Sequence, residues 1–236
     1  MGRTLIYIPI IHADPDLGSL AADLVENATR LMGDYWKEHK KTIRRYWQEV
    51  ERVLEGKTFT NVLIFQDSLP EGGETAQAII DKLAQTGSPN YQLLKRLIQK
   101  GACIQKTENS DLLRQEYQMT KDLLARKNLV SAIFAFLKYK FMKNRLLTAR
   151  DNYIAKQINQ NLKEGETSVC FLGAYHDILS KLANDIKIVL VKNPDKIKKY
   201  YKRLTNGEVV GAINKLARYL VVPIKAGVVF QPSNKL

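Results

Sequence analysis

The chain has 236 residues, of which 37 are Lys or Arg, 24 are Asp or Glu and three are His, so its formal net charge is +13. Hydrophobic residues make up 45% of the chain and charged residues 26%, which excludes a disordered or collagen-like protein. The longest apolar run, residues 129–137, is far shorter than the roughly 18 residues that a membrane-spanning helix needs.

We expect a cytoplasmic protein with no membrane partner. The N-terminus lacks the pattern of a secretory signal peptide, because its short apolar run is broken by Pro9 and is followed by His12 rather than by a small-residue cleavage site. Only two cysteines are present and no CxxC motif occurs, so a disulfide framework is not expected. Cys103 and Cys170 both lie in apolar runs, which predicts two buried free thiols.

Five short apolar runs have the composition of strands that are covered on both faces, as in a parallel sheet. They are residues 4–11, 61–65, 102–105, 168–172 and 186–191. Apolar residues at steps of three and four predict helices between and after these runs. We expect the helices over about 19–55, 75–84, 90–99, 110–125, 129–162, 194–204 and 209–220, with an edge strand over 221–230.

The alternation of strands and helices predicts an α/β fold with a mainly parallel central sheet and flanking helices. No composition shift or linker divides the chain, so we expect a single domain over residues 1–236. Two of the helices, about 19–55 and 129–162, are long and amphipathic. Because their apolar stripes need a covering surface, we expect them to form a helical layer or a dimer arm, and the protein to be a homodimer.

Polar and ionisable residues follow the predicted strands at the point where each strand ends. In an open parallel sheet, ligands bind beyond the carboxyl ends of the strands, so these residues are candidates for one site. They are His12 and Asp14 after the first strand, Gln66, Asp67 and Glu71 after the second, Glu108 after the third, and Tyr175 and His176 after the fourth.

His12 and His176 are the leading candidates for chemistry. A histidine at a strand end can act as a general base, a proton shuttle or a metal ligand. The alternative is a structural histidine that is satisfied by hydrogen bonds in a loop. The third histidine, His39, lies among Lys37, Lys40 and Lys41, and we expect it to be a solvated surface residue.

A divalent metal ion is one candidate cofactor. His12, His176 and Asp67 could ligate it, with Glu71 and Glu108 nearby, or a carboxylate could instead orient a histidine. The alternative is that residues 67–70 form a turn and that Glu108 stabilises the first turn of a helix. The chain contains no HExxH, P-loop, GxGxxG or GxSxG motif, so a zincin, the usual nucleotide sites and the α/β-hydrolase elbow are not supported.

The pair Arg150-Asp151 lies late in the second long helix, before the fourth strand. A guanidinium at this position could clamp a phosphate or a carboxylate. The alternative is an ion pair within the helix or at its end, and the pair by itself favours that alternative.

The order of three segments resembles the TraB/Tiki/erythromycin-esterase-like superfamily, also called ChaN-like. The segments are Ile10-Ile11-His12, Arg150-Asp151-Asn152-Tyr153-Ile154-Ala155 and Gly173-Ala174-Tyr175-His176, and the likeness is strongest over residues 149–176. Because members of the superfamily include esterases and metal-dependent proteases, the resemblance implies a hydrolytic site. It implies catalytic roles for His12, Arg150, Asp151 and His176.

The chain departs from the pattern of that superfamily at three points. Pro9 stands where the first motif usually has Gly, Ala149 stands where Glu often precedes the Arg, and the paired glutamates expected after the first histidine are missing. Gln66, Asp67 and Glu71 are the candidates to replace those glutamates.

Basic residues cluster over residues 37–45, 138–150 and 192–203, and Tyr200 and Tyr201 lie within the third cluster. Basic residues interleaved with aromatic ones can bind nucleic acid. All three clusters fall on predicted helices, however, where charged residues usually form the solvated face, and no nucleic-acid-binding motif is present. A basic rim could equally steer an anionic small substrate.

The leading hypothesis is a hydrolase of the TraB/Tiki-like kind that acts on an anionic or carbonyl-containing small substrate. In it, His12 or His176 is the general base or metal ligand, Asp67, Glu71 and Glu108 orient or ligate, and Arg150 holds the substrate. The alternative is a binding module that recognises nucleic acid, a nucleotide or a protein partner through the basic helices. A third hypothesis is a pseudoenzyme that works through its dimer surface.

Overall fold

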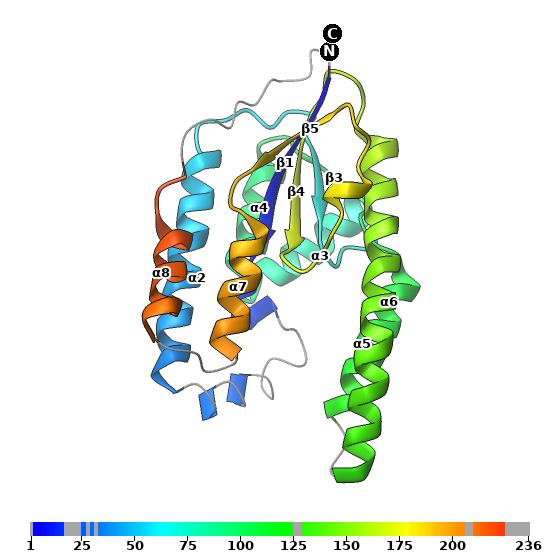
Figure 1. The fold of residues 1–236 in the computed structure, drawn as a ribbon. Coiled ribbons are helices and arrows are strands. Elements are labelled where there is room, and N and C mark those ends of the chain that lie inside the picture. The colour runs from blue at the N-terminus through cyan, green and yellow to red at the C-terminus, as the bar shows by residue number, and fades with distance from the viewer. Residues whose placement is uncertain are drawn as a thin grey trace.

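The computed structural model of the chain describes residues 2–16, 25–26, 29–30, 33–124, 129–205 and 210–224, with side chains described outside 123–141 and 205–212. Five parallel strands form one sheet in the order β3-β2-β4-β1-β5 (Figure 1). The strands are β1 (Arg3–Ile10), β2 (Leu63–Gln66), β3 (Cys103–Gln105), β4 (Thr167–Gly173) and β5 (Ile186–Leu190). The predicted α/β fold with a parallel central sheet is confirmed.

Helices cover both faces of this sheet (Figure 1). In the described part of the chain they are α2 (Asp34–Leu54), α3 (Gly73–Gln85), α4 (Pro89–Gln99), α5 (Ser110–Leu124), α6 (Leu129–Asn161), α7 (Pro194–Thr205) and α8 (Val210–Val221), with a short 3₁₀ helix η2 (Leu179–Lys181). None of the described helices is long and apolar enough to cross a membrane.

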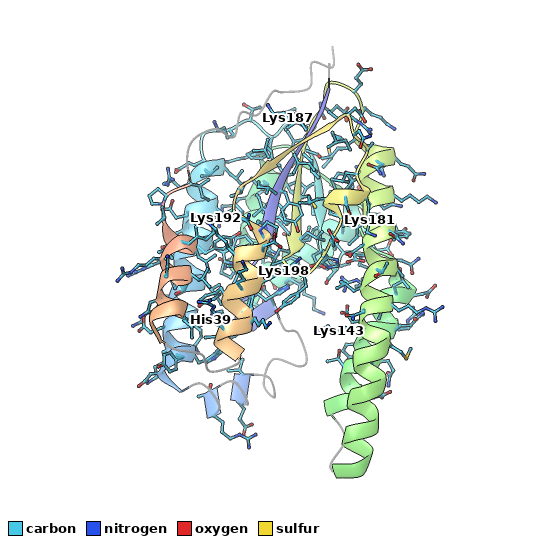
Figure 2. The ribbon with its side chains drawn as sticks, viewed as in Figure 1. His39, Lys143, Lys181, Lys187, Lys192 and Lys198 are labelled. Carbon is cyan, nitrogen blue, oxygen red and sulfur yellow. The ribbon has the colours of Figure 1, made fainter. Side chains whose placement is uncertain are left out.

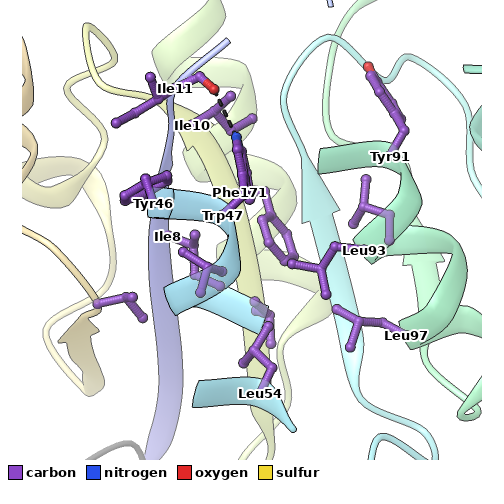
Figure 3. Close-up of a cluster of buried hydrophobic side chains, with 14 of the residues drawn as sticks. Ile8, Ile10, Ile11, Tyr46, Trp47, Leu54, Tyr91, Leu93, Leu97 and Phe171 are labelled. Atoms are coloured by element: carbon purple, nitrogen blue, oxygen red, sulfur yellow. Dashed lines mark hydrogen bonds between the residues drawn. The ribbon is translucent and has the colours of Figure 1, made fainter. Parts of the chain in front are cut away.

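One face of the sheet is covered by α2, α3, α4, α7 and α8. Alternate residues of β1, namely Ile6, Ile8 and Ile10, are buried against this layer, as the two-residue period of a strand requires. The indole of Trp47 fixes α2 in place, because its Nε1 donates a hydrogen bond of 3.0 Å to the carbonyl of Ile11 at the end of β1 (Figure 3).

The opposite face packs against the C-terminal half of α6. Leu5 and Tyr7, the other set of alternate residues in β1, are buried there with Ile154 and Ile158 of α6. The paired helices α5 and α6 lie side by side and continue past the carboxyl edge of the sheet (Figure 1). Residues near the middle of α6 are therefore placed beside the strand ends.

The structure differs from the sequence prediction at particular points. Cys103 is exposed, because it lies on β3 at the edge of the sheet, whereas Cys170 in central β4 is buried. Within the segment predicted as one helix over 19–55, α2 begins at Asp34, directly after Gly33 with a φ of 51°. Residues 19–24, 27–28 and 31–32 of that segment lie outside the described residues, as does most of the strand expected over 221–230.

Candidate functional site

The site is built at the carboxyl edge of the sheet, where β2 and β4 end side by side. The register places Gln66 opposite Phe171, so the next residue, Asp67, lies beside the end of β4. Its side chain reaches the backbone of Gly173 there. The backbone N–H of Asp67 donates to the carbonyl of Phe171 at 2.8 Å, and Asp67 Oδ2 accepts from the N–H of Gly173 at 2.8 Å. A Cβ at position 173 would lie 2.8 Å from that oxygen, so the close approach requires glycine.

Arg150 of α6 holds the buried carboxylates of this edge together. Its Nη2 donates to Asp67 Oδ1 at 2.9 Å, and its Nε lies 3.2 Å from both carboxylate oxygens of Glu108. Its Nη1 donates to Glu116 of α5. Arg150 and Glu108 are 4% and 0% exposed, so the ion pairs of Arg150 with Asp67 and Glu108 are shielded from solvent.

His176 lies between two carboxylates. Its Nδ1 is 2.6 Å from Asp151 Oδ1, and its Nε2 is 3.5 Å from Asp67 Oδ2. The other oxygen of Asp151 accepts from the backbone N–H of Asp177 at 3.0 Å, which fixes the carboxylate. Asp151 is thus the residue that orients the imidazole, as the carboxylate does in histidine-based catalytic sites.

This environment sets the protonation states of the site. Burial alone lowers the pKa of His176, but the negative charges of Asp67 and Asp151 outweigh burial and raise it to about 10. Burial raises the pKa of Asp67, but the charges of His176 and Arg150 outweigh it and hold that pKa well below its usual range. Burial also raises the pKa of Glu108 to about 7. At neutral pH, His176 is therefore an imidazolium beside the ionised carboxylate of Asp67.

His12 forms a second pairing of histidine with aspartate, at the end of β1. Its Nδ1 lies 3.9 Å from Asp16 Oδ2, and its side chain is 44% exposed. The Asp16 carboxylate is buried and accepts from the N–H of Ala13 at 2.7 Å and from the hydroxyl of Ser88. Sequence reasoning missed Asp16 and Ser88; the four-residue spacing from His12 to Asp16 was the signal available.

A cavity of about 440 Å³ connects these groups. His12, Asp67, Arg150 and His176 all line it, as does the half-exposed ring of Tyr175. The two histidines that the sequence placed at strand ends are therefore on one cavity, each with its own aspartate. The volume is in the range of cavities that bind small molecules.

Other predicted residues of the site lie elsewhere. Gln66 is buried behind the cavity, where its Nε2 donates to the carbonyl of Asp67 at 3.1 Å. Glu71 is half-buried and does not line the cavity. Glu108 contributes through Arg150 and not by direct contact with the cavity.

The site does not fit a divalent metal ion. Asp67, Glu108 and His176 can bring one donor atom each within 4.8 Å of one another, and His12 is not part of this group. The guanidinium of Arg150 already pairs with both carboxylates, however, so they are not free to hold a second cation. Arg150 therefore takes the place of a cation in this site. The donor atoms of the predicted metal ligands His12, His176 and Asp67 are not brought together around one point.

His39 is a correction to the sequence prediction, because it is 2% exposed and not a solvated surface residue. Its Nδ1 lies 2.8 Å from the hydroxyl of Tyr200, and its ring lines the cavity on the side of α2 and α7. Figure 2 labels His39 on α2 and Lys143 on α6, which lie at the two sides of the carboxyl edge of the sheet. Burial lowers the pKa of His39 to about 4, so its ring is neutral at neutral pH.

Two residues of the basic cluster over residues 192–203 are buried, whereas a surface that binds nucleic acid needs exposed side chains. Tyr200 is 1% exposed and Lys192 is 6% exposed. The ammonium of Lys192 donates to the carbonyls of Tyr219 and Val222, at 2.9 and 2.7 Å, and so joins α7 to α8. Tyr200 is therefore not available to stack on a base.

No protein-family model, curated protein or solved structure matches this chain.

Proposed function

We propose that the protein is a hydrolase of carboxylic esters or amides. In this reaction His12 is the general base that takes a proton from water, and His176 is the general acid that protonates the leaving group. The observation that carries the proposal is that both histidines line the same cavity, with His176 2.6 Å from Asp151 and His12 3.9 Å from Asp16. Residues of this kind, placed together in a concave site, are the usual apparatus of general acid–base catalysis.

The charges of the site assign the two roles. His176 is protonated at neutral pH and its Nδ1 is committed to Asp151, so its Nε2–H is the proton donor. His12 is the more exposed of the two and takes the proton from the attacking water. The water oxygen then bonds to the carbonyl carbon, and the bond from that carbon to the leaving group breaks as the Nε2 proton of His176 passes to the leaving group. Proton transfer from His12 back to His176 through solvent completes the cycle.

Arg150 and Asp67 support this reaction without taking part in proton transfer. Arg150 is fully engaged by Asp67, Glu108 and Glu116, so it fixes the electrostatic field of the site and does not clamp substrate. Asp67 keeps His176 protonated. The choice of a hydrolytic reaction follows the resemblance of the three motifs, which contain these same site residues, to the TraB/Tiki-like superfamily.

The proposal is tested with the purified chain and a panel of 4-nitrophenyl esters, by following release of 4-nitrophenolate. His12→Gln and His176→Gln should each lower kcat/KM by about 100-fold, the lower bound for loss of a general acid or base. Asp111→Asn is the control, because Asp111 is an exposed residue of α5 outside the cavity. Hydrolysis that persists in both histidine variants would contradict the proposal.

A further inference from the structure

The cavity has two chemically different sides. The ends of β1, β2 and β4 and the middle of α6 contribute the polar groups His12, Asp67, His176 and Arg150. The opposite side is formed by α2 and α7, with the side chains of Trp36, His39 and Leu204. The proposed hydrolytic groups use only the first side, so the second is available for the part of a substrate that does not react.

The side formed by α2 and α7 is a packed set of rings. The ring centroids of Trp36 and His39 are 4.9 Å apart, and those of His39 and Tyr201 are 5.8 Å apart at an interplanar angle of 70°. Tyr200 packs behind them, with its centroid 5.5 Å from that of His39. These are the separations of favourable aromatic pairs, so the rings hold one another in place.

We define the aromatic wall as Trp36, His39 and Tyr201. Trp36 and His39 come from α2, and Tyr201 comes from α7. Trp36 and His39 are three residues apart and share a face with Ile43 and Trp47, which anchor the helix over the sheet. His39 belongs to the wall as an uncharged ring, because it is buried and bonded to Tyr200. The wall is therefore uncharged and aromatic, although Lys37, Lys40 and Lys41 surround His39 in the sequence.

We propose that the cavity selects substrates with a flat aromatic ring, which packs against the wall of Trp36, His39 and Tyr201 while the scissile carbonyl lies between His12 and His176. This inference rests on the proposed function for the position of the carbonyl. The position of the ring depends on the wall alone. A cavity of about 440 Å³ has room for one ring and a short linker.

Binding without turnover tests this inference directly. By isothermal titration calorimetry, 3-phenylpropanoate should bind about three- to tenfold more tightly than 3-cyclohexylpropanoate, the saturated acid of the same length, because edge and face contacts favour the aromatic ring. Trp36→Leu should abolish this preference, and Trp36→Phe should keep most of it. Trp36 is only partly buried, so both variants should fold, which circular dichroism verifies.

His39 supplies a second pair of variants. His39→Phe keeps a neutral ring and should retain the preference, whereas His39→Leu should lose it. Equal affinities for the two acids in the unaltered protein, or a preference that survives both leucine variants, would overturn the inference. A clear preference in a protein that hydrolyses no ester would retain the aromatic site and reject the proposed hydrolysis, so the two failures are distinguishable.

Discussion

Nδ1 of His176 lies 2.6 Å from Oδ1 of Asp151, and the two residues are 25 positions apart in the chain. The helix α6 supplies Asp151 and the turn after β4 supplies His176, so the contact forms only when α6 packs on the sheet. On the far side of the imidazole, Asp67 comes from the end of β2. Three segments thus determine the charge of one histidine.

This arrangement predicts that His176 remains doubly protonated well above neutral pH. In ¹⁵N-edited NMR spectra, its ring should show both N–H protons at pH 8, when ordinary histidines are neutral. Asp151→Asn removes one of the charges that raise the pKa and should move the titration of His176 toward neutrality. Asp111→Asn, at an exposed position, should leave the titration unchanged. A ring that titrates below pH 7 in the unaltered protein would contradict the assigned charge.

The same pairing predicts how stability depends on pH. The folded protein keeps the His176 proton up to about pH 10, whereas the unfolded chain releases it near pH 6.5. The contribution of His176 is therefore complete below pH 6.5 and is lost as the pH rises to 10. Because the pKa of Glu108 is about 7, Glu108 contributes little above pH 8. Burial also raises the pKa of Cys170 and Tyr7, so a His176 variant is needed to separate the contribution of His176 from theirs.

Urea denaturation should therefore give a free energy of unfolding that falls from pH 8 to pH 10, with His176 contributing at most about 1.4 kcal/mol per pH unit. In His176→Gln this slope should be much smaller, because glutamine has no proton to release. The same slope in both proteins would assign the effect to other groups.

Arg150 leads to a prediction about metal binding. Arg150→Met leaves the carboxylates of Asp67 and Glu108 without their cation, and breaking such a buried pair costs about 3 kcal/mol of stability. It also leaves Asp67, Glu108 and His176 close enough to hold a metal. Equilibrium dialysis followed by elemental analysis should find about one zinc ion per chain in Arg150→Met.

Two controls test whether the loss of Arg150 creates the zinc site. The unaltered protein should retain no zinc at the site, and the double variant Arg150→Met with Asp67→Asn should bind at least about tenfold more weakly than Arg150→Met, since it lacks one ligand. If the unaltered protein binds zinc as tightly as Arg150→Met, the guanidinium does not replace a metal.

Much of the fold followed from the sequence because a parallel strand that is buried on both faces is a continuous apolar run. The positions of Asp67 and His176 at one edge followed as well, since each comes directly after a strand and parallel strands end at the same edge of a sheet. The partners of Arg150 could not be predicted in this way. Glu108 is 42 residues and Asp67 is 83 residues away in the chain, and their contact depends on how α6 is rotated against the sheet.

His39 shows how charge in the neighbourhood of a residue can mislead. Its lysine neighbours suggested a solvated position, yet a helix places adjacent residues on different faces. Trp36, His39, Ile43 and Trp47 follow the helical period and form the inward face of α2. The apolar residues at these spacings are a better guide to its burial than the adjacent charges.

Gly173 has no side chain, which allows the carboxylate of Asp67 to reach the backbone of β4. In Gly173→Ala, the new Cβ would lie 2.8 Å from Asp67 Oδ2, too close for a real contact, and that oxygen is bonded to the N–H of residue 173 itself. Asp67 cannot withdraw freely, because its other oxygen is paired with Arg150. We expect a loss of about 1–3 kcal/mol in the free energy of unfolding, as for other overpacked sites.

Displacement of Asp67 should also lower the pKa of His176, because Asp67 supplies one of the charges that raise it. Urea denaturation and NMR titration of Gly173→Ala measure the two effects on the same protein. Gly2→Ala is the matched control, since a Cβ there makes an ordinary contact of 3.4 Å with the carbonyl of Asp185. A Gly173→Ala protein with unchanged stability and an unchanged His176 titration would show that Asp67 does not depend on this close approach.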